Sequence, residues 1–296
     1  MTAGSRRSVF NRLILAALAA LLLGSCGRAA EVHPALWQAE GPQGQKLWLF
    51  GTIHALPAPV AWRSATVDAA LKQADRLVLE VADIANDTAT AQAFADLAQS
   101  PGLLPLEQRV EPDLRDELAA ELKEGSVSPG QLDSYETWAA ALMLQQATAR
   151  AGASDSTNGI DRALAKAWTG PIAEFEGAAA QLAIFDRLPE PQQRALLSAV
   201  VREAPARDGQ TLALQQAWMR GDMDLIAQTT TEEFLDHAEL REALLTGRNR
   251  AWLVQLDAML AQGARPFVAV GAAHLAGVDG LPALLSARGW KVTRLQ

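Results

Sequence analysis

The chain has 296 residues, of which 49% are hydrophobic and 20% are charged, and its formal net charge at pH 7 is -8. This hydrophobic fraction excludes a wholly disordered chain. The negative charge argues against a nucleic-acid partner, because a general nucleic-acid binder needs a basic face. Peptides and small molecules remain as possible ligands. The length is sufficient for one large core, and we expect a single α/β domain over residues 36–296.

Residues 1–26 have the pattern of an export signal. Three arginines precede an apolar run over residues 13–23, which is too short to span a bilayer but suits the centre of a signal peptide. Residues 23–26, Leu-Gly-Ser-Cys, resemble a bacterial lipobox, in which the cysteine is lipidated and becomes the first mature residue. The alternative is ordinary cleavage near residue 30.

Cys26 is the only cysteine of the chain, so no intrachain disulfide can form and lipidation accounts for an otherwise isolated thiol. We predict an exported bacterial lipoprotein on the periplasmic side, held at the membrane only through its N-terminal lipid. Gly27 stands where inner-membrane lipoproteins usually carry aspartate, so we favour the outer membrane over the inner one.

Two strands and a helix are predicted after this signal. Residues 35–38 and 46–50 form a hairpin across a Gly- and Pro-containing turn. The second strand leads directly into Gly51-Thr52-Ile53-His54. Apolar residues at helical spacing then predict a helix over residues 64–74, with Ser64 as its N-cap.

The next strand contains an anomalous acid. Residues 76–83 form a nearly continuous apolar run, which is typical of a central parallel strand. Glu80 lies within this run. A buried carboxylate needs a partner, a proton or a metal ion. Alternatively, Glu80 lies at an exposed strand end or pairs with an arginine for structural reasons.

The middle of the chain is predicted to be helical, apart from a short strand over residues 172–175 that ends at Glu176. The last predicted strand pair covers residues 267–270 and 292–295, with a helix over 281–287 between the two strands. We expect the terminal strands and the short strand to share one mostly parallel sheet, and the helical middle to cover one end of it. The helices of this middle are predicted over residues 85–99, 111–123, 132–151, 163–168, 178–187, 192–202, 210–219, 222–234 and 239–261.

Two of the four histidines follow a strand in the same way. His54 ends the segment that begins at Gly51, and His274 ends Gly271-Ala272-Ala273-His274 after the strand near the C-terminus. Ligand sites of α/β proteins lie beyond the carboxyl ends of parallel strands, and glycine there permits a sharp turn or a close approach. We therefore expect the two histidines to share one site. The alternative is that each histidine caps a strand or satisfies a backbone group. His33 and His237 have no such context, and we expect both to be surface or structural residues.

The polar residues at the strand ends are His54, Glu80, Glu176 and His274. Two histidines and two glutamates are an ordinary ligand set for a divalent metal ion, whose bound water could attack a substrate. Without a metal, histidine and glutamate could activate water directly. Arg248 and Asn249 could orient a carboxylate or an amide, or they could belong to a solvated helix face or a salt bridge.

The motifs also resemble those of the TraB/PrgY/GumN family, to which the animal Tiki proteins are related. The similarity extends over nearly the whole chain after the signal, and Phe175-Glu176 departs from the family's usual Leu-Glu. The matching residues are Gly51-Thr52-Ile53-His54, Leu79-Glu80, Glu176, Gln181-Leu182-Ala183, Arg248-Asn249 with Trp252, and Gly271-Ala272-Ala273-His274-Leu275 with Gly277.

The resemblance implies an α/β fold similar to that of erythromycin-esterase-like and ChaN-like proteins. Tiki is regarded as a metal-dependent protease that favours manganese or cobalt, and its functional positions correspond to His54, Glu80 and His274. The leading hypothesis is thus a divalent-metal-dependent hydrolase acting on a peptide or small molecule. The rivals are a binding protein that sequesters such a ligand and a metal-free esterase-like hydrolase.

Overall fold

A computed structural model describes residues 32–82, 87–151, 154–203, 207–233 and 237–296, and residues 32–296 form one compact unit. The predicted export signal and Cys26 lie outside the described residues. Among the residues that are described, no helix has the length and apolar character needed to cross a bilayer.

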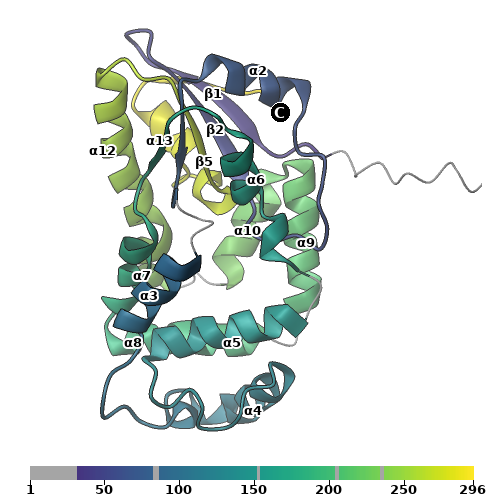
Figure 1. Cartoon of the computed structure of the whole chain (residues 1–296), viewed down its shortest axis with the longest axis vertical. Coiled ribbons are helices and arrows are strands. Elements are labelled where there is room, and N and C mark those ends of the chain that lie inside the picture. The colour runs from purple at the N-terminus through teal and green to yellow at the C-terminus, as the bar shows by residue number, and fades with distance from the viewer. Residues whose placement is uncertain (1–31, 83–86, 152–153, 204–206, 234–236) are drawn as a thin grey trace, which may run out of the picture. The chain divides into compact units, whose positions relative to one another are not determined.

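A six-stranded mixed sheet organises this unit (Figure 1), with strand order β4-β3-β5-β2-β1-β6. The first four strands in this order are mutually parallel. β1 pairs antiparallel with β2, and β6 pairs antiparallel with β1 and so runs in the same direction as the first four. The predicted α/β class with a mostly parallel sheet is therefore confirmed. The strands are β1 (Leu36–Glu40), β2 (Lys46–Thr52), β3 (Arg76–Leu79), β4 (Ile172–Glu174), β5 (Pro266–Gly271) and β6 (Lys291–Arg294).

The register of the parallel strands brings the two Gly-x-x-His motifs together. On the neighbouring strands β2 and β5, Gly51 pairs with Val270 and Thr52 pairs with Gly271. Both strands therefore leave the sheet at the same level. β3 flanks β5 on its other side and ends at Leu79, so that Glu80 follows the strand instead of lying within it. This strand is shorter than the predicted run over residues 76–83.

Both faces of the sheet are covered by helices, as its continuous apolar strands predict. Alternate residues of β2 point to opposite sides: Leu47 and Leu49 belong to one core, and Trp48 and Phe50 to the other. One face is covered by α2 (Ala65–Gln73), α6 (Ile160–Ala167), α9 (Arg207–Arg220) and α10 (Met223–Glu233). The other face is covered by α12 (Gly247–Ala261) and α13 (Leu281–Ala287).

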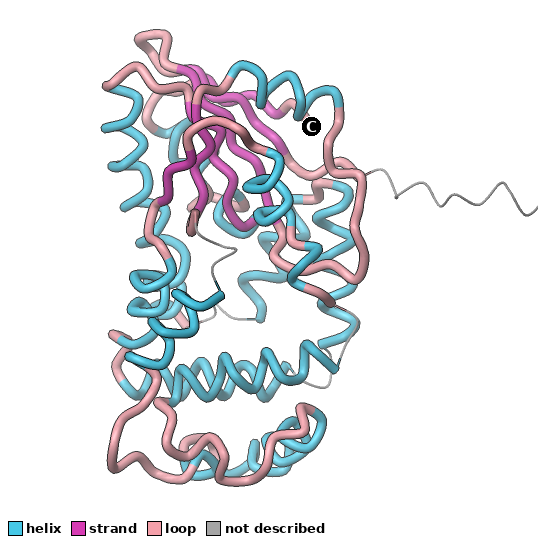
Figure 2. Tube along the Cα trace, viewed as in Figure 1, coloured by secondary structure: helices cyan, strands magenta, loops and turns pink. Residues whose placement is uncertain are grey.

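The remaining helices form a separate core beyond one end of the sheet (Figures 1 and 2). The predicted position is thus confirmed for part of the helical middle, whereas α6, α9, α10 and α12 cover the faces of the sheet. Trp138 is fully buried there, on α5, and the tryptophans of the sheet layers, such as Trp48 and Trp252, are also buried. The helices of this third core are α3 (Asp87–Leu97), α4 (Arg115–Glu124), α5 (Thr137–Ala151), α7 (Ala178–Asp186), α8 (Glu190–Glu203) and α11 (Ala238–Arg241).

Two details differ from the sequence-based expectations. The helix predicted from residue 132 begins only at Thr137, because the buried guanidinium of Arg109 donates to the carbonyls of Asp133 and Tyr135 and holds this segment as a turn. The two C-terminal strands also do not pair with each other. β5 lies in the middle of the sheet, whereas β6 pairs with β1 at the far edge. The predicted N-cap is confirmed, because the Ser64 side chain accepts a hydrogen bond from the Val67 amide.

Candidate functional site

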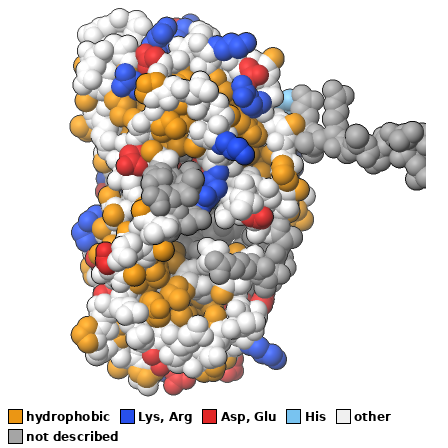
Figure 3. Space-filling model, viewed as in Figure 1, with side chains coloured by type: hydrophobic (Ala, Val, Ile, Leu, Met, Phe, Trp, Pro, Cys, Tyr) orange, Lys and Arg blue, Asp and Glu red, His pale blue; other side chains and the backbone are white. Residues whose placement is uncertain are grey.

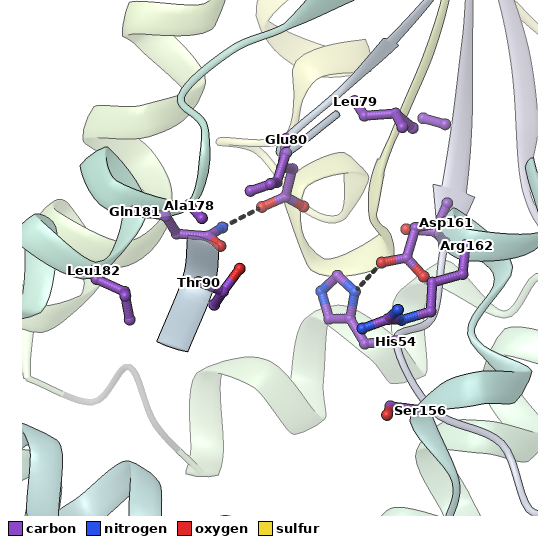
Figure 4. Close-up of a pocket in the computed structure, with 13 residues that line it drawn as sticks. His54, Leu79, Glu80, Thr90, Ser156, Asp161, Arg162, Ala178, Gln181 and Leu182 are labelled. Carbon is purple, nitrogen blue, oxygen red and sulfur yellow. Dashed lines mark hydrogen bonds and ion pairs between the residues drawn. The ribbon is translucent and has the colours of Figure 1, made fainter. Parts of the chain in front are cut away.

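His54 lies beyond the end of β2 and is held by an acid on α6. Its Nδ1 is 2.8 Å from Oδ2 of Asp161, a buried residue in the first turn of that helix. The other ring nitrogen faces the pocket (Figure 4), and the side chain is 66% exposed. Desolvation opposes protonation of the ring, but the hydrogen bond and charge of Asp161 outweigh it and raise the pKa of His54 to about 9.

His274 is the buried counterpart of His54. Its Nε2 is 3.1 Å from Nη1 of Arg248, and its Nδ1 is 2.7 Å from Oδ1 of Asn249. Because a guanidinium can only donate, Nε2 accepts this hydrogen bond and Nδ1 carries the proton that is donated to Asn249. Burial, together with the charge of Arg248, lowers the pKa of His274 to about 3. The imidazole is thus neutral at pH 7.

Glu80 connects the ends of β3 and β5 with the helices α12 and α7. Its Oε1 accepts a hydrogen bond of 2.8 Å from the Gly271 amide, and its Oε2 accepts one of 2.6 Å from Nη2 of Arg248. Gln181 of α7 donates to the same Oε2 at 3.2 Å. Burial favours the protonated acid, but neighbouring positive charge and the Gly271 amide lower the pKa of Glu80, so the carboxylate is ionised.

Arg248 uses all its donors within the protein. The guanidinium makes five hydrogen bonds, to both carboxylate oxygens of Glu176, to Glu80, to His274 and to the Leu244 carbonyl. A guanidinium has five N–H groups, so none is left for a substrate unless one of these bonds is given up. The same group lies 4.8 Å from the ring centre of Trp252. Arg248 is therefore the internal cation of this site.

Asn249 lies behind His274 and does not line the pocket. It is fully buried, and its amide nitrogen donates to the carbonyls of His274 and Asp279. With Oδ1 accepting from His274, its side chain orients the imidazole. The Asn249 side chain thus contacts the imidazole of His274 from the side away from the pocket.

The space beside Gly271 is where the charged and imidazole groups converge. A Cβ atom placed on Gly271 would lie 3.3 Å from Oε1 of Glu80, 3.6 Å from Nε2 of His54 and 3.8 Å from Cδ2 of His274. The corresponding atom on Gly51 would instead meet Ala272, with Cβ at 3.2 Å. The first motif glycine therefore permits the close packing of the two strand exits, and the second keeps open the space between the site residues.

These residues have the donor types of a divalent-metal site, but their spacing does not complete one. Within the described part of the chain, no three His, Cys, Asp or Glu side chains form a group arranged to hold a metal ion. The cause is visible in the contacts: Arg248 donates both to His274 Nε2 and to Glu80 Oε2. Glu176, the fourth predicted ligand, pairs with Arg248 and with Trp252 Nε1.

Two pockets meet at this site. One, the α7 pocket, is lined by Ala178 and Leu182 of α7 and has a volume of about 280 Å³. The other, the α9 pocket, is lined by Leu214 and Trp218 of α9 and has a volume of about 270 Å³. Figure 3 shows the surface hollowed between the sheet and the helical layer, with hydrophobic side chains on both sides of the hollow. The residues that line both pockets are Thr52, His54, Glu80 and Gln181.

Sequence reasoning did not assign a role to Asp161 or Gln181. Asp161 lies in the first turn of α6, where an acid is commonly explained by the helix dipole alone. Gln181 lies on α7, more than one hundred residues from the strand end that it contacts. The residues that sequence reasoning did select, His54, Glu80, Glu176, Arg248 and His274, all belong to this one cluster of contacts.

The paired strand-end motifs, in this order and around one sheet, agree with the comparison to protein-family models. The TraB/PrgY/gumN family matches residues 35–294. The chain belongs to the TraB/PrgY/gumN family. Among the curated proteins and the solved structures, none matches the chain. For this family member, the site therefore has to be interpreted from its own residues.

Proposed function

We propose that this TraB/PrgY/gumN family member is a hydrolase that holds a divalent metal ion between His54, Glu80 and His274. The observation that supports this most is the arrangement of the two imidazoles. Each directs Nδ1 to an oxygen behind it, from Asp161 or from Asn249. Metal-binding histidines almost always have such a second hydrogen bond, which fixes the tautomer and leaves Nε2 for the metal. Because the pKa of His54 is raised to about 9, the metal must displace a proton from its Nε2, so metal affinity should increase with pH up to that value.

The space next to Gly271 is where these ligands would meet, since Glu80 Oε1 and His54 Nε2 both border it. For His274 to join them, Arg248 must release the Nε2 atom to which it now donates. A divalent ion, when bound, would polarise a scissile carbonyl and lower the pKa of a water molecule, so that this water could lose a proton and act as the nucleophile at neutral pH. Manganese or cobalt and a peptide substrate are the choices suggested by the resemblance to Tiki.

The protein's own residues have distinct roles in this proposal. Asp161 holds the His54 ring so that Nε2 faces the pocket, and Gln181 holds one oxygen of Glu80. Arg248 neutralises Glu80 and Glu176, and so keeps two buried carboxylates near each other. Glu176 serves as the anchor of Arg248 and not as a metal ligand.

The first test is metal binding by the purified chain. We expect about one Mn²⁺ or Co²⁺ per wild-type chain, as in an open catalytic site, and none in a His54→Ala/His274→Ala double variant. The matched control is His33→Ala/His237→Ala, which removes the other two histidines. Calorimetry and metal analysis give the stoichiometry, and peptide-library cleavage with Mn²⁺ or Co²⁺ then tests turnover. Equal metal binding by the two double variants would exclude the assigned ligands.

A metal-free hydrolase is the second candidate, and the position of Arg248 favours it. In this alternative the buried guanidinium is the cation of the site, and His54, oriented by Asp161, is the general base once its Nε2 proton is lost, so turnover should rise with pH towards its pKa of about 9. Chelator treatment separates the two proposals, because only the first loses activity. Asp161→Asn should weaken metal binding by about 10- to 100-fold under the first proposal, and should lower turnover without any effect of metal under the second.

We further propose that the chain is exported and anchored through a lipid on Cys26, an expectation supported by residues 1–26. Metabolic labelling with a palmitate analogue should mark the wild-type chain and not a Cys26→Ser variant. Fractionation then distinguishes the outer membrane, which we favour, from the inner one. Labelling of the Cys26→Ser variant would contradict the proposal.

A further inference from the structure

Polar and apolar residues are distributed unevenly between the two pockets. All four residues that line both pockets are polar, whereas each pocket alone adds apolar side chains. The α7 pocket adds Leu79, Val81 and Leu182. The α9 pocket adds Leu214, Trp218 and Ile226. Apolar side chains thus flank the polar junction on both sides. Polar residues also line each pocket: Thr90, Ser156, Asp161 and Arg162 in the α7 pocket, and Thr230, Arg248 and His274 in the α9 pocket.

The size of the pockets limits what each can hold. A pocket for a whole drug-sized ligand has a volume of about 300–1,000 Å³. The α7 pocket, at about 280 Å³, and the α9 pocket, at about 270 Å³, each lie just below that range. Each is therefore suited to one apolar group of a longer ligand.

One buried polar atom at the junction, and a second in the α7 pocket, lack a hydrogen-bond partner among the described residues. Thr52 is 2% exposed, and its hydroxyl has no hydrogen-bond partner among the described residues. Oδ1 of Asp161, which is 6% exposed, is likewise without a partner there, and Asp161 lines the α7 pocket. A buried polar atom left unpaired costs about 1–3 kcal/mol, so these atoms indicate a polar ligand group that includes a hydrogen-bond donor.

We propose that the cleft binds a peptide segment in an extended course, with one apolar side chain in each pocket and the peptide bond between them at the junction. This inference rests on the proposed function for its reaction. It adds the substrate class, which is an internal segment with apolar residues on both sides of the bond that is cleaved. An amide between two apolar side chains fits the observed order of surfaces. An acyl chain has no polar centre to satisfy Thr52, and a saccharide has no apolar arms.

The test measures binding, so that it does not depend on turnover. The probes are capped tetrapeptides whose central pair is Leu-Leu, Leu-Ser, Ser-Leu or Ser-Ser, together with a fatty acid and a disaccharide. Calorimetry on the full chain, with and without Mn²⁺, gives each affinity. We expect Leu-Leu to bind most tightly and each Leu to Ser change to weaken binding about tenfold, as for the loss of a buried leucine side chain.

Two pairs of variants assign the pockets. Ala178→Phe fills the α7 pocket and Thr230→Phe fills the α9 pocket. Neither variant removes a residue of the hydrophobic cores. The matched controls, Ala180→Phe on α7 and Gln228→Phe on α10, add the same ring at exposed positions of the same helices. Ala178→Phe should abolish the preference for leucine at one of the two central peptide positions. Thr230→Phe should abolish it at the other position, and the two control variants should keep both preferences.

Thr52→Val should lower the affinity for all four peptides by a similar factor, because all four share the central amide.

Several outcomes would overturn the proposal. One is that both pocket variants change the preference at the same position or at neither. Another is that the fatty acid or the disaccharide binds more tightly than every peptide. This test can fail independently of the proposed function. Position-specific peptide binding without metal binding or cleavage would refute the hydrolase and support the peptide cleft. Metal-dependent cleavage without position-specific binding would support the hydrolase and refute the peptide cleft.

Discussion

At the scale of single residues, the two motif glycines illustrate how the same sequence pattern has two physical causes. Gly51 is required by close packing against Ala272, whereas Gly271 borders the space between His54 and Glu80. Gly271 has φ of -49° and ψ of 134°, a conformation open to any L-residue. Its role is therefore to leave room, and not to supply backbone freedom.

Gly271→Ala should consequently impair the site while leaving the fold intact. The added methyl group would lie 3.3 Å from Glu80 Oε1 and 3.6 Å from His54 Nε2, in the space assigned to the metal ion. We expect Mn²⁺ or Co²⁺ affinity to fall at least about tenfold, which corresponds to about 1.4 kcal/mol of binding free energy, with a small change in the urea midpoint. Gly209→Ala is the control, because a Cβ atom there meets nothing within 4 Å. Unchanged metal affinity in Gly271→Ala would place the ion elsewhere.

At the scale of secondary structure, the segment before α5 shows tertiary contacts overriding a helical pattern. Apolar spacing extends the predicted helix back to residue 132, but α5 starts at Thr137. Arg109 is 2% exposed and donates to the carbonyls of Leu104, Asp133 and Tyr135. Carbonyls that accept from a guanidinium need no helical partner, so the chain can remain in a turn.

Arg109→Ala should therefore destabilise the helical layer. Three backbone carbonyls would lose their bonds to a buried charged donor, and we expect the free energy of unfolding to fall by about 3 kcal/mol. Arg109→Lys should restore only part of this loss, because an ammonium lacks the planar fork that reaches three acceptors. Urea denaturation measures both variants, with the exposed Arg115→Ala as the control. A loss below about 0.5 kcal/mol, the range of ordinary surface substitutions, would contradict this explanation of the turn.

At the scale of the whole molecule, Arg248 links layers that are far apart in sequence. It extends from α12 to Glu80 after β3 and to Glu176 after β4, and both side chains of each pair are at most 12% exposed. Removing one partner from a buried ion pair leaves an uncompensated charge, which is far more costly than replacing the whole group by apolar residues. The stability of the sheet ends therefore depends on this one cation.

Arg248→Met should lower the free energy of unfolding by about 3–5 kcal/mol, the usual effect of breaking a buried pair. Adding Glu80→Gln and Glu176→Gln should recover much of this loss, because no carboxylate then remains unpaired. Chemical denaturation of the single, double and triple variants measures this coupling. Additive effects would show that Arg248 acts independently of the two acids. Arg250→Met, on the exposed side of the same helix, is the control.

The sequence by itself determined the α/β class, the hairpin of β1 and β2, the central position of β3, the Ser64 cap and the motifs that belong to the TraB/PrgY/gumN family. These follow from local periodicity, capping and spacing. Only the tertiary structure placed Arg248 among the acids, Asp161 behind His54 and Asn249 behind His274. Such contacts join residues up to 168 positions apart, and no local pattern specifies which strand ends and helices meet. The register of parallel strands and the packing of helices over them make that choice.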